Sequence, residues 1–186
     1  MRRYTREDCD ITGEPVGLCQ KVVVYAWENL EKPLPGQLFL CVERDRTDHR
    51  PEMVDLISLS NGERYLGRRE DILGILKPEL LPDEAKLHLS QICLHEKKDF
   101  AKMESMFSGY SFLRDGRYAT GVWLYSPKEA MDYVELQKPY QHRVLICDRD
   151  DFAVFEVVGG KVVFPDGQAL EEFQREQSQD GGMAMT

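Results

Sequence analysis

Three dipeptides that favour tight turns each separate two apolar runs of this sequence: Asn61-Gly62, Asp115-Gly116 and Gly159-Gly160. Glycine and asparagine tolerate the positive φ angles that two-residue hairpin turns require. The flanking runs are short and rich in valine, isoleucine, leucine and aromatic residues, a composition typical of strands. The sequence therefore predicts a chain built largely from antiparallel hairpins.

Further runs extend this pattern of strands. KVVVY at residues 21–25 favours a strand, and the runs QLFLCVE, EMVDLISLS and RYLG between residues 37 and 67 predict a β-meander. The charged residues 44–50 lie between the first two runs of the meander, where a hairpin connection belongs. HRVLICD at residues 142–148 predicts a strand that precedes the Gly159-Gly160 hairpin.

Helical spacing of apolar residues occurs in four segments. We expect a short helix from Glu70 to Leu76, a main helix from Asp83 to about Met106 that stops at Gly109, a helix that begins after Ser126, and a terminal helix at residues 168–177. The third is the clearest, because Ser126 can cap it, Pro127 suits the first helical position and Glu129 stands third.

These elements predict an α+β fold in which a mostly antiparallel sheet, made of a β-meander and hairpins, packs against two or three helices. We expect residues 1–178 to form a single domain and residues 179–186 to form a flexible tail. The chain has 186 residues, which is long enough to bury a core of its own.

Charge and the N-terminal sequence narrow the function classes. The formal net charge of -9 argues against direct nucleic-acid binding, which normally leaves a basic footprint, and permits a basic partner. The N-terminus MRRYTREDCD has no apolar segment of a secretory signal, and no apolar run approaches the roughly 20 residues of a membrane span. We therefore expect a cytoplasmic protein whose 5 cysteines are reduced and mostly buried.

A charged segment before the second meander strand combines acids with a histidine. A metal-dependent nuclease or hydrolase could use its oxygen and nitrogen ligands, which are Asp45, Asp48, His49 and Glu52. Arginines alternate with these acids, however, and such mixed charge is the usual composition of a solvated loop. We expect the tip of a hairpin here and not a catalytic site.

Two cysteine-containing pairs could supply zinc ligands. Cys9 and Cys19 are separated by nine residues, whereas structural zinc usually takes closely spaced pairs. Cys93 and His95 would lie on different sides of a helix. The sequence also contains no nucleotide-binding loop and no nucleophile elbow. We therefore predict a protein without a catalytic residue, metal or cofactor.

Acidic residues gather in two further segments. The first contains Asp148, Asp150 and Asp151, and the second contains Glu171 and Glu172. Carboxylates spaced along an exposed face can imitate the phosphates of DNA and compete for a basic channel. An ordinary solvated surface is the alternative interpretation.

Three segments carry a resemblance to a known family: CDITGEPVG, ERDRTDHRPEMVDLISLSNGE and REDILGILKPELLPDEAKLHLSQI. Together they resemble the type II-A anti-CRISPR proteins, which are small proteins of phages and other bacterial mobile genetic elements. The similarity covers most of residues 9–92. It provides no functional motif from which site residues could be assigned.

The resemblance implies a non-enzymatic inhibitor in the cytoplasm of a bacterial host. Its partner would be a type II RNA-guided DNA nuclease with its guide RNA, and binding would impair the engagement and cleavage of target DNA. The partner-binding residues that we predict are the acidic set Asp148, Asp150, Asp151, Glu171 and Glu172, followed by Asp45 and Asp48. The alternative function is a regulatory or interaction module of a mobile element that has no nuclease target.

Overall fold

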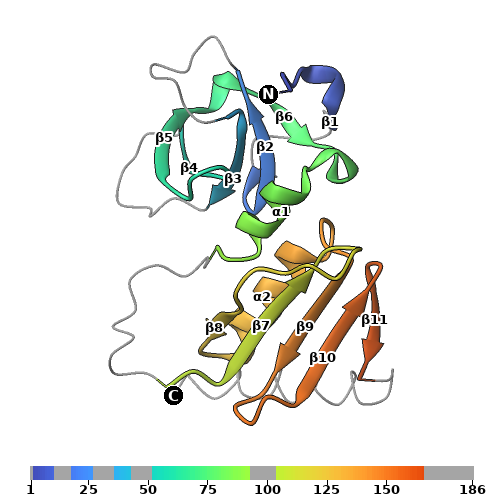
Figure 1. Ribbon diagram of the computed structural model, residues 1–186. Coiled ribbons are helices and arrows are strands. Elements are labelled where there is room, and N and C mark those ends of the chain that lie inside the picture. Colours follow the sequence, from blue (N-terminus) through green and yellow to red (C-terminus); the bar gives the residue numbers. More distant parts are fainter. Residues whose placement is uncertain (1, 11–17, 27–35, 43–51, 93–103, 166–186) are drawn as a thin grey trace. The chain divides into compact units, whose positions relative to one another are not determined.

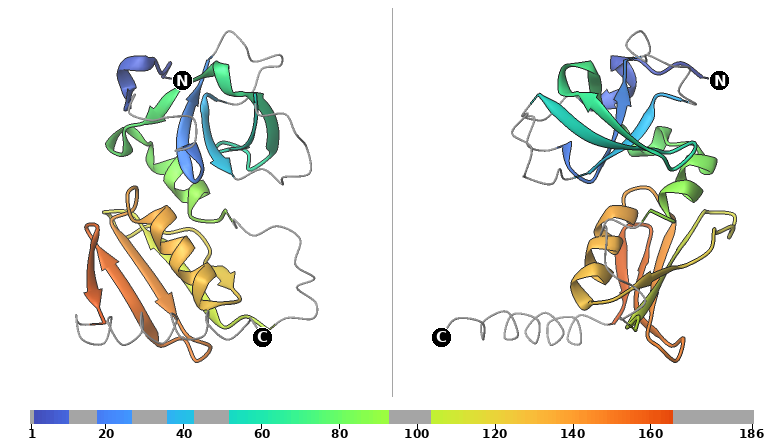
Figure 2. Two further views of the ribbon diagram at one scale, coloured as in Figure 1. Left: turned by 180° about the vertical axis from the view of Figure 1, so that it is seen from behind. Right: turned by 90° about the vertical axis from the view of Figure 1, so that its left-hand side faces the viewer.

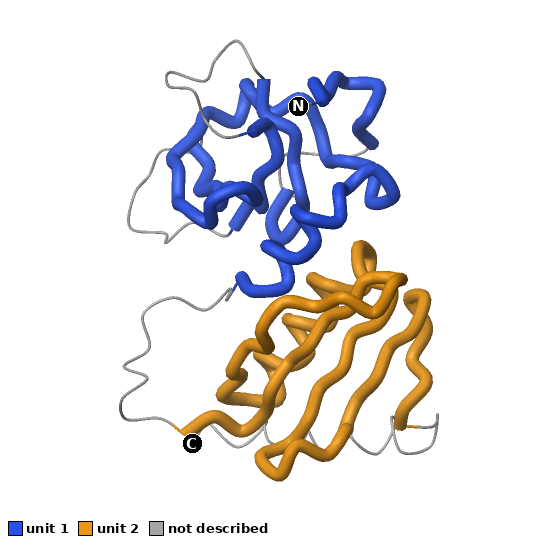
Figure 3. The backbone as a smooth tube through the Cα atoms, in the orientation of Figure 1, with its two compact units in different colours: residues 1–94 blue, residues 95–186 orange. Residues whose placement is uncertain are grey.

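The structure, a computed structural model, describes residues 2–10, 18–26, 36–42, 52–92 and 104–165. The chain divides into two compact units, Met1–Leu94 (unit 1) and His95–Thr186 (unit 2), which Figure 3 shows in different colours. Each unit contains its own antiparallel sheet and is described by itself. The single domain over residues 1–178 stays a prediction, and the expected tail at residues 179–186 lies outside the described residues.

Unit 1 contains a six-stranded antiparallel sheet with the strand order β1-β6-β2-β3-β4-β5 (Figure 1). The strands are β1 Cys9–Asp10, β2 Lys21–Tyr25, β3 Leu38–Val42, β4 Met53–Ser58, β5 Arg64–Arg68 and β6 Ile72–Leu76. Strands β3, β4 and β5 form the predicted meander, and the turn at Asn61-Gly62 is present with Gly62 at φ 71°. The connection predicted at residues 44–50 lies outside the described residues.

The centre of unit 1 is formed by strands that are buried on both faces. All five residues of β3 are buried, and only Lys21 of β2 is exposed. This explains why both strands are continuous apolar runs without alternation. The core cluster joins Val23, Tyr25, Phe39, Cys41, Val54 and Leu56.

The first predicted helix, Glu70 to Leu76, is wrong. Arg69–Asp71 forms one turn of 3-10 helix, and Ile72–Leu76 is strand β6, which pairs with both β1 and β2. A short apolar run fits a strand as well as a helix, and here pairing in the sheet decided between them.

The main helix is much shorter than predicted. Helix α1 covers Asp83–Leu89, and the Ser90 hydroxyl donates to the Leu87 carbonyl at its end. Phe107, which we expected inside the helix, begins strand β7. Gly109 does not end a helix but lies in β7, where a Cβ atom would stand 2.9 Å from the Tyr133 ring. Residues 93–103 of the predicted helix lie outside the described residues.

Unit 2 contains a five-stranded antiparallel sheet with the order β11-β10-β9-β7-β8, and helix α2 covers one face of it (Figure 2). Its elements are β7 Phe107–Phe112, β8 Val122–Leu124, α2 Pro127–Gln137, β9 Arg143–Cys147, β10 Ala153–Val158 and β11 Lys161–Phe164. The predicted hairpins at Asp115-Gly116 and Gly159-Gly160 are confirmed. The predicted terminal helix at residues 168–177 lies outside the described residues.

Helix α2 begins as the sequence predicts. The Ser126 hydroxyl accepts the Glu129 N–H at 3.2 Å, and the buried Glu129 carboxylate accepts the Tyr125 N–H at 3.0 Å. These bonds satisfy N–H groups that a helix start would otherwise leave without partners. They fix where α2 starts relative to β8.

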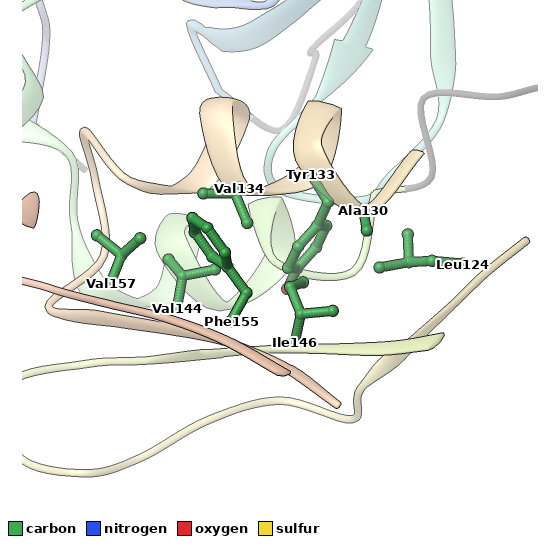
Figure 4. Close-up of a cluster of buried hydrophobic side chains, with 8 residues drawn as sticks. All are labelled: Leu124, Ala130, Tyr133, Val134, Val144, Ile146, Phe155 and Val157. Carbon is green, nitrogen blue, oxygen red and sulfur yellow. The ribbon is translucent and has the colours of Figure 1, made fainter. Parts of the chain in front are cut away.

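The core of unit 2 lies between α2 and the sheet (Figure 4). It contains Leu124, Ala130, Tyr133, Val134, Val144, Ile146, Phe155 and Val157. The Tyr133 hydroxyl is bonded to the Ser111 hydroxyl at 2.8 Å, and burial raises the pKa of Tyr133. Sheets and helices together confirm the predicted α+β class with its mostly antiparallel strands.

Candidate partner-binding site

The turn between β9 and β10 contains three of the predicted site residues. The Phe152 and Asp150 N–H groups both donate to Asp148 Oδ1, at 2.9 and 3.0 Å. The Asp151 N–H donates to the Asp148 carbonyl at 3.1 Å and closes the turn. Asp148 is half-buried, and its Oδ1 supports the backbone of the turn by accepting both of these bonds.

The other two carboxylates of this turn are presented to solvent. Asp150 and Asp151 are both exposed. Asp151 has φ 64°, in the left-handed region that aspartate enters more readily than most residues. Phe152, which follows, is 69% exposed. We call Asp150, Asp151 and Phe152 the acidic tip.

Arg149 holds the acidic tip against the segment before β7. Its Nε donates to the Ser105 carbonyl at 3.1 Å, and its guanidinium forms an ion pair with Glu104 at 3.2 Å. Both side chains of this pair are well exposed, so the ion pair itself contributes little stability. The ion pair instead sets the direction of the Arg149 side chain. Its positive charge points toward Glu104.

The structure gives no position for the remaining predicted partner-binding residues relative to the acidic tip. Glu171, Glu172, Asp45 and Asp48 lie outside the described residues. His49, a possible metal ligand of the same segment, also lies there, whereas Glu52 is described and exposed. The partner-binding role of the whole set stays a prediction.

Three of the described cysteines are poor nucleophiles. Cys9, Cys41 and Cys147 are buried, and burial raises the pKa of all three thiols. The pKa of Cys41 rises to about 11, first through burial and then through the nearby Cys19. At neutral pH such thiols stay protonated, whereas the thiolate is the form that attacks or binds metal.

Among residues 2–10, 18–26, 36–42, 52–92 and 104–165, no three His, Cys, Asp or Glu side chains gather in a way that could hold a metal ion. Cys93 and His95, the second possible zinc pair, lie outside these ranges. The predicted absence of a catalytic residue, metal and cofactor stays a prediction.

Sequence reasoning missed a set of aromatic side chains on unit 2. Tyr118 is 55% exposed and Trp123 is 64% exposed, although large apolar side chains usually seek burial. A signal was available in the sequence, because Tyr110 and Phe112 alternate with Ser111 in a strand whose other side must face α2. A strand in which aromatics alternate with small residues predicts that the small residues lie under the helix and that the aromatics lie on the opposite face.

Comparison with known proteins identified no matching family model, no matching curated protein and no matching solved structure. In the part of the chain that the structure describes, no helix is long and apolar enough to cross a membrane.

Proposed function

We propose that this chain is a non-enzymatic inhibitor of a type II RNA-guided DNA nuclease, which binds the nuclease–guide complex and impairs target DNA binding and cleavage. The acidic tip is the observation that supports this proposal best. It presents the Asp150 and Asp151 carboxylates beside a Phe152 side chain that is 69% exposed. The net charge of -9 and the resemblance to anti-CRISPR proteins support the same function.

The physical basis is competition for a basic surface. Nucleases of this type hold the guide–target duplex in a positively charged channel and read the flanking motif with arginines. Two adjacent carboxylates can replace DNA phosphates there, and complementary charge accelerates the encounter. An exposed phenylalanine next to them can enter an apolar pocket and contribute to affinity as aromatic anchors do.

A cleavage assay tests the proposal directly. Purified nuclease, guide and matching DNA are mixed with the protein in slight molar excess, added either before or after the DNA. We expect loss of cleavage when the protein is added first and a smaller effect when DNA is already bound. We also expect inhibition to weaken as salt increases, because screening reduces the attraction between exposed charges.

Substitutions then locate the contact. Asp150→Lys combined with Asp151→Asn should raise the inhibitory concentration at least about tenfold, which corresponds to the loss of one close charge pair at an interface. Asparagine suits position 151 because it tolerates the positive φ that Asp151 adopts. The matched control is Glu79→Lys combined with Glu7→Gln, which makes the same change of net charge at two exposed residues of unit 1.

Three outcomes would contradict the proposal or its assigned contact. Full cleavage with several nucleases of the type would favour the alternative, a regulatory or interaction module of a mobile genetic element. Unchanged inhibition by the double variant would remove the acidic tip as the contact. A hydrolytic activity that Asp48→Ala with His49→Ala abolishes would indicate an enzyme instead.

A further inference from the structure

The face of the unit 2 sheet opposite α2 is lined by aromatic rings. Residues of a strand alternate between faces, and Ser111 of β7 faces α2 through its bond to Tyr133. Tyr110 and Phe112 therefore lie on the opposite face, where both are half-buried.

Two more rings lie on this face: Tyr118, which precedes β8, and Trp123, which belongs to β8. Cross-strand partners share a face, so Trp123 lies beside Ser108 and Tyr118 lies beside Phe112. The Tyr118 ring centroid is 6.2 Å from that of Tyr110 and 5.0 Å from that of Phe112. We call Tyr110, Phe112, Tyr118 and Trp123 the aromatic stripe.

Gly121 makes the stripe continuous. A Cβ atom at this position would lie 2.5 Å from Cε1 of Tyr110, so the ring rests directly on the glycine backbone. The Tyr110 ring consequently lies along the segment that joins Tyr118 to Trp123. Any larger residue at 121 would displace it.

The stripe already accommodates one guanidinium. Cζ of Arg143 lies 5.0 Å from the centroid of the Phe112 ring, and its Nε donates to Glu156 at 2.6 Å. Cations are attracted to the electron-rich face of aromatic rings, and tryptophan and tyrosine attract them at least as strongly as phenylalanine. Trp123 and Tyr118, the two most exposed rings, are therefore suited to further cations.

The acidic tip lies at the Trp123 end of the stripe. Strand pairing forms one row across the sheet, from Trp123 through Ser108 and Cys147 to Ala153. The turn that carries the acidic tip begins immediately after Cys147 and ends immediately before Ala153. The acidic tip and Trp123 thus lie toward the same end of the sheet, with β7 between β8 and the strand that leads into the tip, whereas Tyr118 pairs with Phe112 at the other end of β7.

We infer that the aromatic stripe and the acidic tip together form a binding surface for an arginine-rich segment of a basic protein. Guanidinium groups stack on Trp123 and Tyr118, and neighbouring ones pair with Asp150 and Asp151. This complementarity of charge selects a cationic occupant over a neutral apolar one. The inference extends beyond nuclease inhibition, because any basic protein with such a segment would qualify.

Single-stranded nucleic acid is the macromolecule that such rings would otherwise suggest. Bases stack on aromatic side chains, but the backbone then needs a positively charged groove. Here the acidic tip would repel phosphates, and two nearby arginines are already in ion pairs, Arg143 with Glu156 and Arg117 with Asp115. The charges therefore favour a basic protein segment.

The test uses the full chain and a fluorescein-labelled peptide of alternating arginine and serine, with anisotropy as the readout. A second peptide replaces each arginine by citrulline, which has the same shape without the charge. We expect saturable binding of the arginine peptide and at least about tenfold weaker binding of the citrulline peptide. Equal affinity for the two peptides, or no binding of either, would overturn the inference.

Variants separate the rings from the carboxylates. Trp123→Leu with Tyr118→Leu keeps an apolar surface but removes the rings, and it should weaken binding about tenfold. Asp150→Asn with Asp151→Asn alters no core packing and should weaken binding as well. The control is Leu66→Ala, which removes an exposed apolar side chain of unit 1 and should retain affinity.

Circular dichroism confirms that each variant is folded, and Tyr118→Leu alone replaces the double variant if that variant is not. Wild-type affinity in both ring variants would refute the stacking. Tight binding of an oligouridine RNA that the ring variants abolish would identify a base-stacking surface and also refute the inference. Because no nuclease is present, failure here is distinguishable from failure of the inhibitor proposal.

Discussion

The two units of the chain differ in how many large apolar side chains they expose to solvent. Eight such side chains are exposed among the described residues, and only Leu66 belongs to unit 1. The other seven, in unit 2, are Met106, Tyr118, Trp123, Phe152, Val162, Val163 and Phe164. Unit 1 directs its apolar residues inward, whereas unit 2 uses one face of its sheet for α2 and presents aromatics on the other.

Both units also contain buried polar side chains that form hydrogen bonds. In unit 1, Gln37 accepts from the Tyr4 N–H and donates to the carbonyls of Tyr4 and Tyr25, which attaches the N-terminal segment to the sheet. Such a fully bonded buried amide stabilises a particular arrangement of the chain. The difference teaches that unit 1 is the better place to measure stability and unit 2 the better place to look for binding.

The largest effect is expected from the core of unit 1. Phe39 is 1% exposed and contacts Tyr25 and Tyr65 edge to face. Phe39→Ala should lower the free energy of unfolding by about 3–5 kcal/mol, because it removes a large buried side chain and leaves a cavity. Chemical denaturation followed by circular dichroism measures this. A loss below about 1 kcal/mol would break the comparison between the units.

The next largest effect should be a dependence of the free energy of unfolding on pH. The pKa of Cys41 is about 11 in the folded chain, above its usual value of 9.0, because burial disfavours the thiolate. The resulting stabilisation is complete below pH 9 and is lost as the pH rises through 11. Unfolding free energy should fall by on the order of 2 kcal/mol across this window. Cys41→Ala should flatten the dependence, and an unchanged slope in that variant would contradict the assignment.

The start of α2 should give a smaller effect in unit 2. Ser126→Ala removes the side-chain oxygen that accepts the Glu129 N–H and should cost about 1 kcal/mol. Ser126→Thr keeps an acceptor and should recover most of this loss. Equal stability of the alanine and threonine variants in thermal denaturation would show that the cap is energetically unimportant.

The smallest change in stability is expected at Trp123, and it tests the difference between the two units most sharply. Trp123 is 64% exposed, so Trp123→Leu should change the free energy of unfolding by no more than about 0.5 kcal/mol. The same variant should reduce binding of the arginine peptide. A destabilisation as large as that of Phe39→Ala would mean that Trp123 is a packing residue and not part of a binding surface.

The residues that favour turns predicted much of the fold. The helical spacing of apolar residues, used alone, misassigned two segments. The hairpins at Asn61-Gly62, Asp115-Gly116 and Gly159-Gly160 form because glycine meets a local backbone requirement. Ile72–Leu76 and the segment before Gly109 have apolar spacing that suits a helix, yet Ile72–Leu76 pairs in a sheet and Phe107 begins a strand. Pairing partners distant in sequence decide such cases, and no local pattern contains them.

By itself, the sequence determined those properties that depend on neighbouring residues: the hairpin turns, the start of α2 at Ser126, and the acidity of Asp148, Asp150 and Asp151. Only the tertiary structure decided which of these carboxylates supports the turn and which are presented, because backbone N–H groups converge on Asp148. It also decided that Trp123 and Tyr118 share a face with Tyr110, since register across strands, and not order along the chain, places side chains together.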